Sequence, residues 1–142
     1  MTDVPAGFAP NTRRSGLTDP WEPIYIRETS EALIIGLRAT AAHCNARGFV
    51  HGGLISALAD NAMGHSMRLH LPEGARLVTV NLYLDYLASG QQGQWLSFET
   101  EFVRPGRTLA FAQCFVRADG ETIARGNATF RATRPRTETA VA

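Results

Sequence analysis

The chain has 142 residues, 44% of them apolar, which is enough for one ordinary hydrophobic core and predicts a single domain. Its 14 basic residues, all of them arginine, stand against 13 acidic ones and leave a net charge of +1. That balance argues against nucleic acid or an anionic membrane as a partner, and the lack of lysine excludes catalysis by a lysine amine.

The two cysteines, Cys44 and Cys114, form no CxxC pair, and the N-terminus has no apolar segment typical of a signal peptide. These features predict a reducing, cytoplasmic location. The longest uncharged stretch after the polar turn, residues 48–59, falls short of the roughly 20 apolar residues that span a bilayer. We therefore expect no transmembrane segment.

Taken in chain order, residues 1–23 contain four of the seven prolines and little periodicity, which predicts an irregular N-terminal leader. Residues 24–28 and 32–40 then have the pattern of two strands in a hairpin. Residues 54–70 are apolar on nearly every side until Arg68, which predicts a helix enclosed by the fold.

Four more strands are predicted in the second half of the chain, over residues 76–89, 94–104, 108–118 and 121–133. Short turns separate them, so we expect neighbours in sequence to pair antiparallel. The first of these strands alternates apolar with more polar residues, which predicts one apolar face made of Val78, Val80, Leu82, Leu84 and Tyr86.

One buried helix and six strands predict an α+β fold in which a twisted antiparallel sheet wraps around the helix. The domain is expected over residues 24–133, and residues 134–142 are expected to be a disordered tail. A single sheet of this kind has a free edge, which favours pairing with a second copy of the chain. The pattern therefore predicts a homodimer.

The most concentrated polar signal combines Asn45, His51, Gly52 and Gly53 with Asp60 on the helix that follows. Glycines at a helix start leave backbone amides open to a carbonyl oxygen, and the positive end of the helix favours developing negative charge. The alternative interpretation is a tight turn without a chemical role. A carboxylate within an apolar helix is costly unless a cleft solvates it or a partner pairs with it, so Asp60 is either functional or a structural cap or ion-pair partner.

The spacing of these groups sets a geometric condition. At about 1.5 Å of rise per residue, Asp60 lies roughly 10 Å along the helix axis from the Gly53 amide. One helix cannot easily present both groups to one carbonyl, whereas two antiparallel helices side by side could. We therefore expect composite sites at a two-fold interface, two per dimer.

The segment HCNARGFVHGGLISALADNAMG resembles the signature of the hotdog-fold acyl-CoA thioesterases of the phenylacetate-pathway type. The resemblance covers most of residues 20–133, including VRPGRTLAFAQCFV. It implies a hotdog fold, in which an antiparallel sheet wraps one long central helix, and homodimers that usually form a homotetramer. It also implies a hydrolase that cleaves an aryl- or medium-chain acyl-CoA into free acid and coenzyme A, with no cofactor or metal.

Carried over by this resemblance, Gly52 matches the amide that polarises the thioester carbonyl, with Gly53 as the second choice. Asn45 and His51 match the residues that orient the thioester. These residues would form one half of the active site.

Asp60 matches the carboxylate that either attacks the carbonyl or activates water, and Thr79 matches a hydroxyl that helps to hold this water. Arg104 and Arg107 flank a Pro-Gly turn and could bind the phosphates of coenzyme A, although an ordinary solvated turn is an equally good interpretation.

Two other functions are compatible with parts of the sequence. Asp60 and His65 share the D-x4-H spacing of (R)-specific enoyl-CoA hydratases, but the Asn-Pro of that motif is absent and both residues lie inside the predicted helix. A non-catalytic acyl-CoA binding or sensor module is the other candidate. A sensor of this fold would need an added DNA-binding segment, and the leader is too short and proline-rich for a helix-turn-helix.

Overall fold

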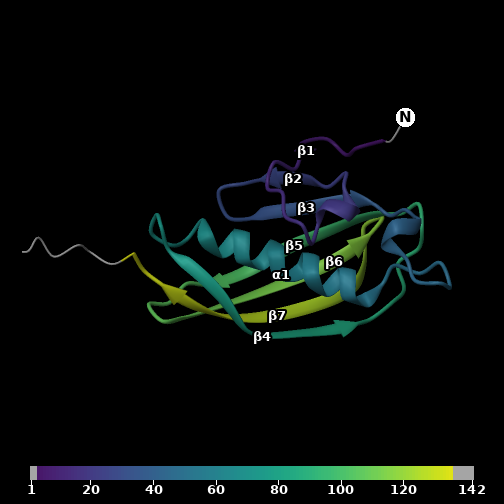
Figure 1. Ribbon diagram of the computed structural model, residues 1–142. Helices are drawn as coiled ribbons and strands as arrows, with labels where there is room; N and C mark the ends of the chain where they lie inside the picture. Colours follow the sequence, from purple (N-terminus) through teal and green to yellow (C-terminus); the bar gives the residue numbers. More distant parts are fainter. Residues whose placement is uncertain (1–2, 136–142) are drawn as a thin grey trace, which may run out of the picture.

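Seven strands form one antiparallel sheet in the computed structural model, which describes residues 3–135. Their order across the sheet is β1-β2-β3-β5-β6-β7-β4. The long helix α1 (Gly52–Arg68) lies across one face of this sheet (Figure 1). The predicted fold class, an antiparallel sheet around one long central helix, is confirmed. The strands are β1 (Ala9–Pro10), β2 (Tyr25–Glu28), β3 (Leu33–Arg38), β4 (Arg76–Tyr86), β5 (Trp95–Arg104), β6 (Leu109–Ala118) and β7 (Glu121–Thr133).

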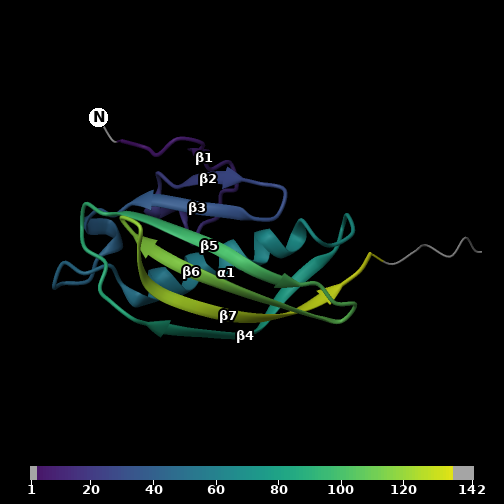
Figure 2. The same cartoon turned by 180° about the vertical axis from the view of Figure 1, so that it is seen from behind.

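The opposite face of the sheet carries no helix within residues 3–135, as the view from behind shows (Figure 2). The described chain also contains two single-turn helices, η1 (Asp19–Trp21) in the leader and η2 (Ala41–His43) after β3. Between residues 3 and 135, no helix combines the length and the hydropathy that crossing a membrane requires.

The hydrophobic core lies between α1 and the sheet. Leu58 and Met63 of the helix and Phe98 of β5 are almost fully buried, and burial of each such side chain stabilises the fold by about 1.5–3 kcal/mol. Ser66 is buried among them because its hydroxyl accepts from the Leu33 N–H and also donates to the Leu33 carbonyl. The helix is therefore held to β3 by polar contacts as well as by packing.

The short turns give the expected antiparallel pairing at two of three places. Asp119 and Gly120 join β6 to β7 with φ values of 48° and 86°, the positive values that a type I′ hairpin turn requires. The turn at residues 105–108 likewise joins the paired strands β5 and β6. The prediction is wrong for β4 and β5, because β4 pairs with β7 at the sheet edge whereas β5 pairs with β3.

Residues 87–94 lead from the edge strand β4 to β5, past the ends of β7 and β6. The N–H groups of Leu87 and Ala88 donate to the Ile123 carbonyl in β7, and the Gly93 N–H donates to the Ala39 carbonyl, one residue beyond the end of β3. The connection therefore follows the end of the sheet rather than turning back on β4. Backbone hydrogen bonds to distant strands fix this path, and the local sequence does not contain that information.

The apolar face predicted for β4 is interrupted by a β-bulge. Thr79 pairs with Phe130 and Asn81 with Thr129, so Val80 is the extra residue. Before the bulge Thr79 faces the helix, and after it Leu82 and Leu84 do. Val78 and Val80 are consequently 62% and 60% exposed, not part of the inner face.

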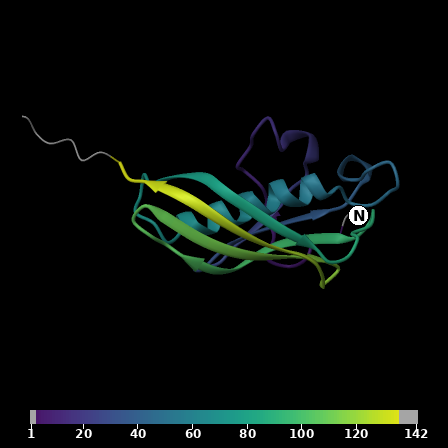
Figure 3. The same ribbon diagram turned by 90° about the horizontal axis from the view of Figure 1, so that it is seen from below.

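The leader is packed against the rest of the fold. β1 pairs with β2, and the Asn11 N–H donates to the Ile24 carbonyl at 2.8 Å. The view from below shows that the leader passes over the same side of the sheet as α1 (Figure 3). Most of the predicted C-terminal tail, residues 136–142, lies outside the described residues.

Candidate active site

A tight hairpin turn holds Asn45 in front of the start of α1. Its side-chain Oδ1 accepts from the N–H groups of Arg47 and Phe49 at 3.0 and 3.2 Å. Gly48 has a φ of +82°, which only glycine adopts without strain. The Nδ2 group of Asn45 has no hydrogen-bond acceptor among residues 3–135, so the turn leaves two amide donors available to a ligand.

His43 is a buried structural residue next to this turn. Its Nδ1 accepts from the Thr40 N–H at 2.8 Å, which places the ring proton on Nε2, and Nε2 donates to the Trp21 carbonyl at 2.9 Å. The side chain is only 2% exposed. Both ring nitrogens are therefore occupied by structural contacts that connect the leader, η2 and the turn.

His51 is the N-cap of α1. Its Nδ1 accepts from the Gly53 N–H at 2.8 Å, so the ring proton of the neutral imidazole lies on Nε2. The Gly52 N–H has no acceptor within the described chain. Of the two predicted polarising amides, Gly52 is thus the one free to bind an oxygen, while Gly53 is already engaged.

Tyr86, at the end of β4, contacts the same helix turn. Its hydroxyl donates to the Gly52 carbonyl at 2.9 Å and is hydrogen-bonded to the Ser56 side chain. The alternation of residues 76–89 predicts Tyr86 only on an apolar strand face. Its hydroxyl, which fixes the first helical turn, could not be assigned because no sequence signal links residues 34 positions apart.

Asp60 lies two turns further along α1, beside β4. The Thr79 hydroxyl donates to Asp60 Oδ1 at 2.8 Å, and both residues line a cavity of about 210 Å³ with Leu77 and Phe130. Thr79 reaches Asp60 because it lies on the helix side of β4 just before the bulge. The two residues that the sequence separates by 19 positions therefore form one unit.

Within one chain, the two groups of candidate residues remain apart. His51 and Gly53 line a cavity of about 420 Å³ with Trp21, and this cavity shares no residue with the one at Asp60. Asp60 is seven residues beyond Gly53 on a continuous helix, which separates them by about 10 Å along the axis. The other predicted residues, Arg104 and Arg107, flank the β5–β6 turn at the end of the sheet opposite the Asn45 turn (Figure 1).

Comparison with known proteins identifies the family. The sequence profile of the thioesterase superfamily matches residues 47–124, more than half of the chain and most of the described helix and sheet. The chain belongs to the thioesterase superfamily. A Pseudomonas aeruginosa protein named as an esterase is 34% identical over 131 residues, which cover 92% of this chain and 98% of that one. Human acyl-coenzyme A thioesterase 13 is 30% identical over 99 residues, covering 68% and 70% of the two chains.

Solved structures share the fold of this thioesterase. A Bacillus halodurans protein crystallised with CoA superposes with a TM-score of 0.66 at 30% identity, covering 70% of this chain and 66% of that chain. A variant of the phenylacetic acid degradation protein PaaI from Thermus thermophilus gives a TM-score of 0.68 at 21% identity, covering 79% and 93%. The predicted membership of the hotdog thioesterases is confirmed, and the protein is a thioester hydrolase.

The cysteines of this thioesterase have no features of nucleophiles. Burial raises the pKa of the Cys114 thiol to about 12, with a further contribution from Glu101, and burial also raises the pKa of Cys44. Neither thiol forms a thiolate at neutral pH to a useful extent. Among residues 3–135, no three His, Cys, Asp or Glu side chains come together in a group that could hold a metal ion.

Proposed function

We propose that this thioester hydrolase cleaves acyl-CoA into free acid and coenzyme A at composite sites shared by two copies of the chain. In each site, Asp60 and Thr79 of one copy face the Asn45–Gly53 turn of the other. The name of the human relative and the CoA bound in the Bacillus halodurans structure support the substrate class. The signature between residues 43 and 64 and the PaaI-like fold support the phenylacetate-pathway branch.

The observation that carries the proposal is the separation of the two half-sites on one rigid helix. His51 and Gly53, on either side of the free Gly52 amide, line one cavity, and the Asp60–Thr79 pair lines another, so one chain cannot place both groups on the same carbonyl. Two helices packed antiparallel would bring each amide opposite the other chain's carboxylate.

The edge of the sheet supports this pairing. β4 pairs only with β7 within the described chain, so its other edge is unpaired, and Val78 and Val80 are exposed on it. We propose that two β4 edges meet in the homodimer. Leu109, Phe102 and Phe111 on the uncovered sheet face are exposed apolar residues that suit a second contact, between dimers in a homotetramer.

The proposed reaction needs few groups because a thioester has weak resonance stabilisation and a thiolate leaving group. Thr79 donates its hydroxyl proton to Asp60 Oδ1, so the lone pairs of its oxygen can accept from a water molecule. Asp60 takes a proton from this water while the water oxygen bonds to the carbonyl carbon, and the carbonyl π electrons move to the oxygen. Collapse of this intermediate breaks the C–S bond, and the departing sulfur takes up the proton.

The turn of the other chain completes the site. The Gly52 N–H donates to the developing oxyanion at the positive end of α1. The Nε2–H of His51 and the Nδ2 group of Asn45 are the remaining donors, and they orient the thioester. We assign Arg104 and Arg107 to the phosphates of coenzyme A, since both are exposed at a turn beyond the catalytic groups.

Replacing Asp60 with Asn tests the proposal, with Glu121→Gln as a matched control because Glu121 is an exposed carboxylate at the start of β7. Thiol release from acyl-CoA should fall by at least about 100-fold in Asp60→Asn and stay within about twofold of wild type in the control. Undiminished thiol release in folded Asp60→Asn would refute the role of Asp60. Hydration of crotonyl-CoA without thiol release by the wild type would refute the thioesterase proposal in favour of a hydratase.

A further inference from the structure

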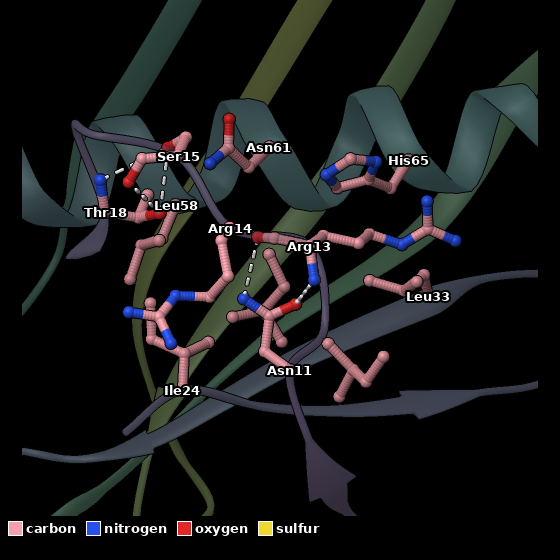
Figure 4. Close-up of a pocket in the computed structure, with 12 residues that line it drawn as sticks. Asn11, Arg13, Arg14, Ser15, Thr18, Ile24, Leu33, Leu58, Asn61 and His65 are labelled. Carbon is pink, nitrogen blue, oxygen red and sulfur yellow. Dashed lines mark hydrogen bonds between the residues drawn. The ribbon is translucent and has the colours of Figure 1, made fainter. Parts of the chain in front are cut away.

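A third cavity, the leader cavity, lies beneath the leader, on the side of α1 that faces β2 and β3. It has a volume of about 190 Å³. Its floor is apolar and comes from the sheet and the helix, whereas its rim is polar and comes from the leader (Figure 4). The floor consists of Ile24, Ile26, Leu33, Ile35 and Leu58, and the rim of Asn11, Arg13, Arg14, Ser15 and Thr18.

This leader cavity adjoins the cavity that contains Asp60. Asn61 and His65 of α1 line both cavities, so the two share one wall. Asn61 directly follows Asp60 on the helix. An acyl group whose carbonyl lies at Asp60 could therefore extend past these two side chains and under the leader.

Two of the three arginines at this junction have no ion-pair partner among residues 3–135. Arg14 is paired with Asp19 at 2.8 Å and with Glu22 at 3.6 Å. Arg13 forms no ion pair with any carboxylate between residues 3 and 135, and its side chain runs alongside His65 (Figure 4). Arg68, which lines the Asp60 cavity, is likewise without a carboxylate partner in the described chain.

His65 does not add to this charge. Burial, together with the nearby guanidinium groups of Arg13 and Arg68, lowers the pKa of His65 to about 4. The imidazole is therefore neutral at neutral pH, and the two arginines supply the positive charge at the rim. A cavity with an apolar floor and an unpaired guanidinium at its rim suits a ligand with an apolar body and an anionic end.

We infer, on the basis of the proposed function, that the leader cavity binds the distal part of the acyl group and that Arg13 binds a carboxylate at its end. The volume supports a group of the size of one ring or a short chain, since a cavity of about 150 Å³ accommodates benzene. The preferred substrate class is thus the coenzyme A monothioester of a short dicarboxylic or carboxyaryl acid. Arg13 is a specificity residue in this assignment and takes no part in bond cleavage.

Hexanoyl-CoA and adipoyl-CoA test this inference, because both acyl chains have six carbons and only adipoyl ends in a carboxylate. Wild-type kcat/KM should favour adipoyl-CoA by about tenfold or more. Arg13→Gln should abolish most of that preference through a loss on adipoyl-CoA, with hexanoyl-CoA little changed. Arg131→Gln, at an exposed arginine of β7 that lines neither the leader cavity nor the Asp60 cavity, is the matched control, and its ratio should stay within about twofold of wild type.

Binding to the Asp60→Asn variant, measured by calorimetry, separates this inference from the proposed function. If Asp60→Asn binds adipoyl-CoA more tightly than hexanoyl-CoA, and the double variant with Arg13→Gln does not, the inference is supported. This holds even if the wild type hydrolyses neither substrate. Equal loss on both substrates in Arg13→Gln, with weaker inhibition by free coenzyme A, would assign Arg13 to the coenzyme A phosphates and overturn the inference. Absence of any adipoyl preference in binding and in kcat/KM would also overturn it.

Discussion

Replacing Gly52 with proline would remove a single hydrogen-bond donor from the proposed oxyanion site. Gly52 is the first residue of α1, where proline is well tolerated because its fixed φ suits the first helical turn and no intrahelical N–H is lost. His51 before it is extended, with φ −68° and ψ 131°, as a residue preceding proline should be. The substitution should therefore delete the N–H and leave the helix intact.

The matched control is Gly52→Ala, which keeps the N–H. An added Cβ would lie 3.4 Å from two ring carbons of Tyr86, an ordinary contact distance. Loss of one oxyanion donor lowers kcat by about 100-fold to 1,000-fold, so Gly52→Pro should fall in that range while Gly52→Ala stays within a few-fold of wild type. Thiol release gives kcat and KM, and circular dichroism gives the Tm of each variant.

Two results would refute this reasoning. If folded Gly52→Pro were as active as Gly52→Ala, the amide would not stabilise the oxyanion. If Gly52→Ala lost as much activity as Gly52→Pro at an unchanged Tm, the effect would be steric contact with Tyr86 and not loss of the donor.

Further predictions concern the remaining contacts. Thr79→Val should lower kcat by about 10-fold to 100-fold at nearly unchanged KM, because the Asp60 carboxylate loses a charge-assisted hydrogen bond. Thr79→Ser keeps the hydroxyl and should retain most of the wild-type kcat. An unchanged kcat in Thr79→Val would contradict this. His43→Ala should lower the free energy of unfolding by about 1–3 kcal/mol, since it removes a buried side chain that bonds two backbone groups, the Thr40 N–H and the Trp21 carbonyl. Denaturant titration would show no such change if the ring were dispensable. The pKa of His65 is near 6.5 in the unfolded chain and about 4 in the folded chain, so acidification between these values favours the unfolded chain. The Tm of the wild type should therefore fall more than that of His65→Gln between pH 7 and pH 5. Equal falls in Tm would exclude His65 as the cause. Val80→Lys should give folded monomers with little activity in light scattering and thiol-release assays, whereas active dimers would show that β4 is not the interface.

The sequence was sufficient for the features that depend on local pattern. The apolar stretch after Gly53 forms the buried helix, and Asp119-Gly120 forms the hairpin turn that its residue types predict. The resemblance matches Thr79 to a hydroxyl that helps to hold the catalytic water, which stays a prediction, and in the structure this hydroxyl donates to Asp60 Oδ1.

The features that sequence reasoning missed depend on contacts between distant segments. The bulge at Val80 shifts the alternation of β4, and no residue type in that strand marks it. The hydrogen bonds from Leu87 and Ala88 to Ile123 direct the chain across the sheet, although the same linker composition suits a hairpin.

The role of the leader was missed for the same reason. Its prolines and lack of periodicity predicted an irregular segment, yet β1 pairs with β2 and Arg13 reaches α1 beside His65. The cavity at this point is formed by three segments that are separate in the sequence, so neither its volume nor its lining could be inferred from any one of them.

The central claim is that each active site is shared between two chains, and mixing two inactive variants tests it most directly. Asp60→Asn retains an intact turn, and Gly52→Pro retains an intact Asp60–Thr79 pair. After random exchange of subunits, about half of the dimers are mixed and one of the two sites in each is intact, so activity should return to about a quarter of wild type. Activity that stays at the level of the separate variants, although mixed dimers are shown to form, would contradict the shared site.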